Sequence, residues 1–235
     1  MIKDAAVIEG SAHVASLDAE HELDVEDPSG LQPSVEQPGP GRRMTLNMGP
    51  QHPSTHGVLR VVLELDGETI LKARPEIGYL HTGIEKECEV KKYQQVIPLT
   101  DRVDYLANLS NNLCYSLAVE RLLELEIPPM AQWMRVMLAE LTRISSHLIW
   151  LGTHALDIGA MSVYFYCFRE REEILKIFEM FSGQRMMTSY IRIGGLALEP
   201  PRGWHKAVGA VMERLKNGID EYQNLLAKNP IWVNR

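Results

Sequence analysis

Residues 58–78, VLRVVLELDGETILKARPEIG, alternate between apolar and charged side chains with the period of two that is typical of a half-buried strand. The apolar positions on one face are Leu59, Val61, Leu63 and Leu65, and the charged positions on the other are Arg60, Glu64 and Asp66. Asp66-Gly67 is a hairpin turn signal, and residues 69–73 form the expected returning strand. With TLNM at residues 45–48, this stretch predicts a small antiparallel sheet beginning near Met44.

Beyond Gly83 the apolar residues recur at steps of three and four, the period of a helix, and no later segment predicts a strand. The expected helices span residues 106–125, 130–151, 163–181 and 204–227, and Pro128-Pro129 mark a helix start. The expected apolar faces include Leu106, Leu109, Leu113 and Leu117 in the first helix and Met130, Trp133, Met134 and Met137 in the second. The predicted fold class is therefore α+β, a small N-terminal antiparallel sheet followed by a bundle of at least four helices.

Charge is distributed unevenly along the chain, which has 235 residues and a formal net charge of −7. Residues 1–41 hold nine acidic residues and one basic residue, whereas the rest holds 22 acidic and 23 basic residues. The composition predicts a disordered acidic tail over residues 1–42 and an ordered domain over residues 43–235. A basic stripe is missing from both parts, which excludes an electrostatic footprint for nucleic acid.

Cysteine and hydropathy patterns exclude several further classes. Cys88, Cys114 and Cys167 form no CxxC pair, so the sequence predicts neither a disulfide framework nor a four-thiolate metal site, which fits a reducing compartment. The N-terminus lacks the basic start and apolar core of a secretory signal. No run of 18 uncharged apolar residues predicts a transmembrane helix.

The loop GPQHPSTHG, residues 49–57, places His52 and His56 four residues apart among turn-forming residues. Because the loop is not a helix, the pair does not form the HxxxH zinc arrangement. Two interpretations stay open: an ordered turn with two surface histidines, or a histidine that donates a proton near neutral pH.

Asp157 is the only formal charge between Arg143 and Arg169. A lone carboxylate in such an apolar segment is costly to bury unless it is paired or hydrogen-bonded, so some partner is expected, and a functional role is one interpretation. A capping aspartate at a helix junction, with Gly152 and Gly159 on either side, is the competing interpretation. The histidines, glycines and hydroxyl residues of the segment fit a membrane span poorly.

The segment TDRVDY, residues 100–105, is expected at the start of a helix. Asp101 and Asp104 there are typical capping residues, and Arg102 and Tyr105 would present a cation and a phenol on one helical face. RIGG at residues 192–195 predicts only a turn, and no GxGxxG or GxxxxGK[ST] motif indicates a nucleotide site.

Seven motifs together resemble one family: MTLNMGPQHPSTHGVLR, RPEIGYLHTGIEK, DRVDYL, ELTRISSHL, THALDIGAM, FREREEIL and YIRIGG. In this order and spacing they resemble the D-type subunit of the proton-pumping NADH:quinone oxidoreductase, complex I, over residues 44–235. The resemblance implies a fold like that of nickel-iron hydrogenase large subunits. It also implies a peripheral-arm protein on the cytoplasmic face of the bacterial inner membrane that helps to form the quinone-reduction chamber.

Carried over by position, the resemblance implies that His56 and Tyr105 contact the quinone headgroup and that Asp157 is the acidic partner of that histidine. His52 would line the same loop. Quinone reduction takes two electrons and two protons, and an imidazole and a phenol are suitable proton donors. Loss of the proton from His56 would change its interaction with Asp157. This suggests how quinone reduction is coupled to proton translocation.

The resemblance also implies the partners. Arg102 matches an arginine close to the terminal 4Fe-4S cluster, which the neighbouring B-type subunit holds, and Met187 stands where many members carry a histidine that links the potential of this cluster to pH. Because methionine does not titrate, that proton site is expected to be absent or supplied elsewhere. The expected partners are the B-type and C-type subunits and the membrane-arm subunit facing the quinone channel, with quinone as substrate and no cofactor bound by this chain.

The hydrogenase relation makes a negative prediction and leaves alternatives open. Asp104 and Ala107 occupy the cysteine positions of the hydrogenase RxCxxC pattern, so no nickel or iron is expected in this chain. A non-catalytic scaffold and a component of a membrane-bound hydrogenase-like complex are the alternatives. Members of the family continue well beyond NPIWVNR, so a fragment, a split gene and an incomplete gene model all fit the length.

Overall fold

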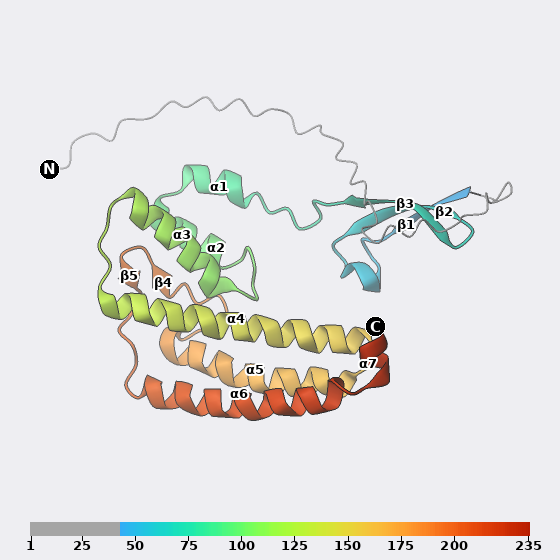
Figure 1. Cartoon of the computed structure of the whole chain (residues 1–235). Helices are drawn as coiled ribbons and strands as arrows, with labels where there is room; N and C mark the ends of the chain where they lie inside the picture. Colours follow the sequence, from blue (N-terminus) through green and yellow to red (C-terminus); the bar gives the residue numbers. More distant parts are fainter. Residues whose placement is uncertain (1–42) are drawn as a thin grey trace. The chain divides into compact units, whose positions relative to one another are not determined.

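The computed structural model describes residues 43–235, drawn in colour in Figure 1. The chain divides into two compact units between Thr82 and Gly83, and each is described by itself. The predicted acidic tail, residues 1–42, lies outside the described residues. Within the described part, no helix is long and apolar enough to cross a membrane.

The first unit is the predicted antiparallel sheet. Its strands are β1 (Arg43–Met48), β2 (Arg60–Asp66) and β3 (Thr69–Glu76), in the order β1-β2-β3. Leu63 and Leu65 are the buried residues of β2, as the alternating pattern predicted. Gly67 follows Asp66 with φ +61°, a conformation that glycine adopts without steric cost, so the hairpin turn is confirmed.

The second unit is helical, as the change of period predicted. Its helices are α1 (Ile84–Val90), α2 (Tyr93–Thr100), α3 (Asn108–Leu122), α4 (Pro129–Asp157), α5 (Met161–Ser182), α6 (Trp204–Leu226) and α7 (Pro230–Asn234). The long helices α4, α5 and α6 run side by side, with α5 packed against both of the others (Figure 1). The four predicted helices correspond to α3, α4, α5 and α6, so the α+β class is confirmed.

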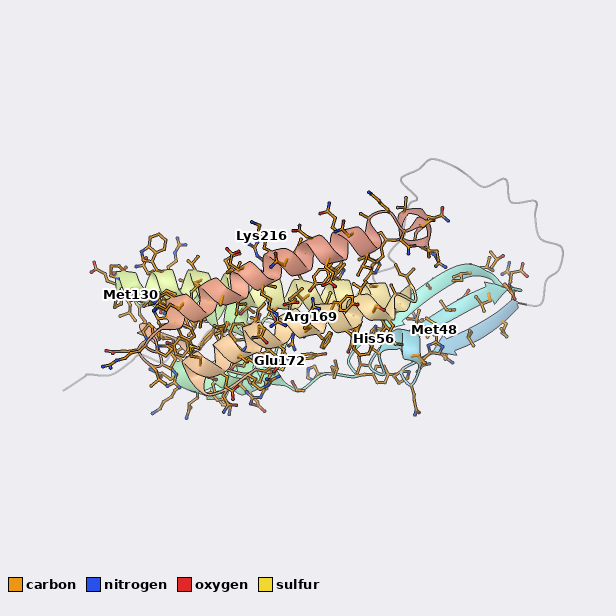
Figure 2. All side chains as sticks on the ribbon, turned by 90° about the horizontal axis from the view of Figure 1, so that it is seen from below. Met48, His56, Met130, Arg169, Glu172 and Lys216 are labelled. Carbon is orange, nitrogen blue, oxygen red and sulfur yellow. The ribbon has the colours of Figure 1, made fainter. Side chains whose placement is uncertain are left out.

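A buried carboxylate joins α5 to α6. Glu170 is 2% exposed and accepts hydrogen bonds from Arg169 Nε at 2.6 Å and from Arg214 Nε of α6 at 2.7 Å. Figure 2 shows Arg169 on α5, from which its Nη2 reaches Glu221 Oε2 of α6 at 2.7 Å. Two arginines therefore compensate the cost of burying this carboxylate between the helices.

Three expectations from the sequence are wrong in detail. Two short strands, β4 (Ile191–Arg192) and β5 (Gly195–Leu196), follow Gly83, where none was predicted. The buried face of α3 is largely polar, and Leu117 from its expected apolar face is 51% exposed. In α4, Met130 and Trp133 are exposed because Ala131, Met134, Leu138 and Leu141 form the packed face.

Candidate functional site

The histidine loop of the first unit is an ordered turn built around Thr55. This buried side chain has its Oγ1 3.1 Å from Pro50 O and 3.0 Å from His52 O, so the hydroxyl donates within the loop. His52 Nδ1 accepts a hydrogen bond from Ser54 N at 3.1 Å, which leaves its Nε2 as the proton-bearing nitrogen of the neutral ring. His56 has φ 53° and is exposed. The turn thus presents an exposed imidazole on a fixed backbone, at the end of the sheet where β1 finishes at Met48 (Figure 2).

Gly49 is required by the closure of this loop. A Cβ at this position would lie 2.1 Å from Leu59 O and 2.7 Å from Thr55 Oγ1, and φ is +86°. We expect Gly49→Ala to lower the free energy of local unfolding of the β1–β2 ladder by about 2 kcal/mol or more, because a backbone atom must move. Amide hydrogen exchange of β2 in the full chain measures this.

Gly57→Ala is the matched control for Gly49→Ala. Gly57 has φ +77°, but an added Cβ would meet nothing within 4 Å. Its cost is therefore limited to the left-handed backbone penalty, about 1 kcal/mol. If Gly49→Ala and Gly57→Ala lowered the protection of β2 amides against hydrogen exchange equally, the contact with Leu59 O would not contribute to the stability of the loop.

The segment that carries Arg102 and Tyr105 is a turn and not the start of a helix, contrary to the expectation. Helix α2 ends at Thr100 and α3 begins at Asn108. Asp104 Oδ1 accepts from Leu106 N at 2.9 Å, a local bond that competes with helix formation. Arg102 Nη1 donates to Pro98 O at 2.6 Å, and Tyr105 is 59% exposed. The guanidinium and the phenol therefore lie on one exposed turn and share no helical face.

Asp101, expected to cap a helix N-terminus, is instead the C-cap residue of α2 and is fully buried. Its Oδ1 accepts from Asn112 Nδ2 of α3 at 2.6 Å, and its Oδ2 accepts from Ser189 N at 3.0 Å and from Ser189 Oγ at 2.5 Å. Burial raises the pKa of Asp101, and the hydrogen bonds from Ser189 and Asn112 oppose the rise. Asp101 thus joins the turn of Arg102 and Tyr105 to a segment 88 residues further along the chain.

Met187 lies in that second segment, two residues before Ser189. Both are non-glycine residues with left-handed backbone angles, φ 50° for Met187 and 43° for Ser189. Between them Thr188 is buried, and its Oγ1 accepts from Asn108 Nδ2 at 3.4 Å. The structure therefore brings the segment of Met187 and the turn that begins at Asp101 together through residues of α3.

The RIGG turn does more than reverse the chain, contrary to the expectation. It connects β4 to β5, and a buried ion pair between α3 and α4 holds its backbone. Glu120 Oε1 accepts from Gly194 N at 2.7 Å, while Arg135 Nη2 donates to Arg192 O at 2.7 Å and to Gly195 O at 3.0 Å. No local signal in the sequence predicts this cluster, because Glu120 and Arg135 resemble ordinary surface positions of two helices.

Asp157 is the last residue of α4, and its side chain is exposed. The expectation that this carboxylate is buried beside a partner is not met within residues 43–235, because the last turn of α4 reaches solvent. Asp157 does lie at a helix junction, between α4 and α5, as the competing interpretation expected, but the cap residues there are Ile158 and Ala160. Asp157 is therefore accessible to a group outside this unit.

The candidate residues are divided between the two compact units. His52 and His56 belong to the first unit. In the second unit, Asp101 ties the turn of Arg102 and Tyr105 to the segment of Met187. Among residues 43–235, no cluster of three or more His, Cys, Asp or Glu side chains is arranged to hold a metal ion.

A second feature is an apolar groove between α4 and α6 with a volume of about 930 Å³. Its lining includes Leu148, Trp150 and Ile219, together with Trp232 of α7, whose ring centroid lies 5.5 Å from that of His154. None of the candidate residues lines it. The groove is therefore not part of the candidate site.

Comparisons with known proteins point to one family. Residues 157–235 match the family described as respiratory-chain NADH dehydrogenase, 49 Kd subunit. The NADH-quinone oxidoreductase D subunit 1 of Solibacter usitatus is 74% identical over 195 residues, which cover 83% of this chain and 48% of that protein. The D subunit 2 of Koribacter versatilis is 63% identical over 201 residues, covering 86% and 50% of the two chains.

A third relative extends the same pattern. The NADH-quinone oxidoreductase D subunit of Geobacter sulfurreducens is 59% identical over 192 residues, which cover 82% of this chain and 49% of that protein. The chain thus spans about half the length of the curated relatives it matches.

Proposed function

We propose that this chain, which is similar over most of its own length to D-type subunits of NADH-quinone oxidoreductase, forms part of the quinone-binding chamber of such a complex. In this proposal it supports electron transfer from NADH to quinone coupled to proton translocation and is not catalytic alone. The observation that carries the proposal is the identity of 74% over 195 residues to a protein with this name.

The proposed quinone contacts are His56 and Tyr105, with His52 on the same loop as His56. Their exposure supports the proposal, because a group that donates a proton to a bound ligand must be reachable. The fixed backbone of the histidine loop adds orientation, since its turn is closed by the bonds of Thr55. In this proposal the chain donates protons to the quinone and orients it. The electrons come from the iron-sulfur cluster that the neighbouring B-type subunit holds.

Arg102 and Met187 are proposed to face that cluster. The bonds between Asp101 and Ser189 support the proposal, because they hold the two segments that carry these residues together. We propose the B-type and C-type subunits and the membrane-arm subunit at the quinone channel as partners, at the cytoplasmic face of the inner membrane. We propose that the likeness to nickel-iron hydrogenases is one of fold without metal, because Asp104 and Ala107 lack the thiolates that nickel requires.

Asp157 is proposed to act as the acidic partner of His56, which couples loss of the histidine proton to charge movement. We expect Asp157→Asn in the assembled complex to lower quinone-dependent NADH oxidation and proton pumping by roughly tenfold or more, because a carboxylate that stabilises a proton donor contributes to its catalysis. Oxidation of NADH with an artificial acceptor that bypasses quinone should stay unchanged.

Asp220→Asn is the control for this test, because Asp220 is an exposed carboxylate of α6 outside the resemblance motifs. It should leave all three activities unchanged. Wild-type quinone-dependent activity and pumping in Asp157→Asn would remove the proposed role of Asp157. Equal losses with quinone and with the artificial acceptor would favour a scaffold over a quinone site.

A further inference from the structure

We propose that Asp101 is a positioning residue whose buried carboxylate fixes the turn of Arg102 and Tyr105 against the segment of Met187. This inference rests on the proposed function, which places Tyr105 beside the quinone and Arg102 and Met187 beside the cluster. Asp101 itself is fully buried, so it acts through its neighbours and does not touch the ligand.

Both oxygens of this buried carboxylate accept hydrogen bonds. A buried carboxylate is tolerated when donors surround it, and three donors reach Asp101, one from Asn112 and two from Ser189. Asn112 is itself held, because its Oδ1 accepts from Thr100 Oγ1 at 2.6 Å. The carboxylate therefore has one defined position between α2, α3 and the segment of Ser189.

The backbone of the segment that Asp101 holds is unusual. Met187 and Ser189 both have positive φ angles that non-glycine residues rarely adopt. Such conformations persist only where the surrounding structure imposes them, and they cluster at functional positions. Asp101 binds both the backbone N–H and the hydroxyl of Ser189, so it supplies part of this restraint and influences where the Met187 side chain points.

Asp101 is also linked directly to the exposed turn. Arg102 follows Asp101 in the chain, and its guanidinium bends back to Pro98 O at 2.6 Å. Tyr105 lies three residues further on, before α3 begins at Asn108. Because Asn108 and Asn112 of α3 bind Thr188 and Asp101, one face of this helix aligns both segments.

The test uses the assembled complex with wild-type partner subunits. Asp101→Ala removes the acceptor and should raise the KM for quinone roughly tenfold, since small misplacements of positioning groups have effects of this size or larger. Asp101→Asn should stay within about twofold of wild type, because the Asn112 amide can rotate and restore complementary bonds. Ser189→Ala should fall between the two, because the backbone N–H of residue 189 remains. Oxidation of NADH with an artificial acceptor should be unchanged in all three.

A double variant separates positioning from general loss of structure. If Asp101 and Ser189 act through their mutual bonds, Asp101→Ala combined with Ser189→Ala should raise KM no further than Asp101→Ala alone.

Thr142→Ala is the control, because its hydroxyl is fully buried but bonds only to Leu138 O within α4. It should leave the KM for quinone unchanged.

The outcomes distinguish this inference from the proposed function. A KM unchanged in Asp101→Ala, or raised equally in Asp101→Asn, would overturn the positioning role. If Asp101→Ala does not assemble, an unchanged KM in Ser189→Ala overturns it instead. Loss of quinone activity in His56→Ala with no effect at Asp101 would leave the proposed function standing, whereas normal quinone activity in His56→Ala would remove the proposed function itself.

Discussion

Replacing His56 with alanine in the assembled complex is expected to lower quinone-dependent NADH oxidation by about two orders of magnitude, the contribution of a positioned proton donor. The exposed imidazole is held by a turn whose hydrogen bonds come from Thr55 and the backbone, so its removal should leave the loop folded. The measurement is the initial rate of NADH oxidation with quinone, divided by the rate with an artificial acceptor that bypasses quinone, on the same preparation. This ratio should fall in His56→Ala.

Tyr105→Phe and His205→Ala complete this experiment. Tyr105→Phe deletes only a hydroxyl from an exposed ring, so a loss confined to quinone activity would assign that loss to the phenol as a donor. His205 is an exposed histidine of α6 outside the motifs that carry the resemblance, and His205→Ala should leave both rates unchanged. A parallel fall of both rates in His56→Ala would mean that the loop serves assembly instead.

The sheet and the long helices were predictable because their signals are local. Alternation around Leu63 and Leu65 and the turn at Asp66-Gly67 define the hairpin within a few residues. The three- and four-residue period similarly identified α4, α5 and α6. The end of α4 was missed because Gly152 suggested a break, whereas the close approach of Tyr164 Cα and Cys167 Cβ to this position explains why a glycine stands inside the helix.

The buried polar residues were not predictable because their partners are distant in the sequence. Asp101 is buried with hydrogen bonds from Asn112 of α3 and from Ser189, which lies 88 residues further along the chain. A periodic pattern of leucines instead suggested that Leu117 faces the core, and it is exposed. Likewise, the apolar stretch around Asp157 suggested burial, but in the last turn of α4 Ala155 faces the core while Asp157 is exposed.

Glu120→Ala is expected to lower the free energy of unfolding of this chain by about 3 to 5 kcal/mol, because it leaves a buried arginine without its partner. Glu120 and Arg135 are 4% and 3% exposed, with bidentate contacts at 2.6 and 2.9 Å. The substitution also removes the acceptor for Gly194 N, so the turn between β4 and β5 loses a bond at the same time. Urea unfolding followed by far-ultraviolet ellipticity measures the change.

Glu140→Ala on α4 is the matched control, because it removes the same carboxylate from an ion pair with Arg143 whose side chains are 50% and 63% exposed. An exposed pair contributes less than about 1 kcal/mol, since water solvates both charges when the pair is broken. The difference in free energy of unfolding between Glu120→Ala and Glu140→Ala therefore measures how much the burial of the pair increases the cost of breaking it. If Glu120→Ala cost no more than Glu140→Ala, water would have to reach Arg135 readily, and the turn between β4 and β5 could not owe its position to this pair.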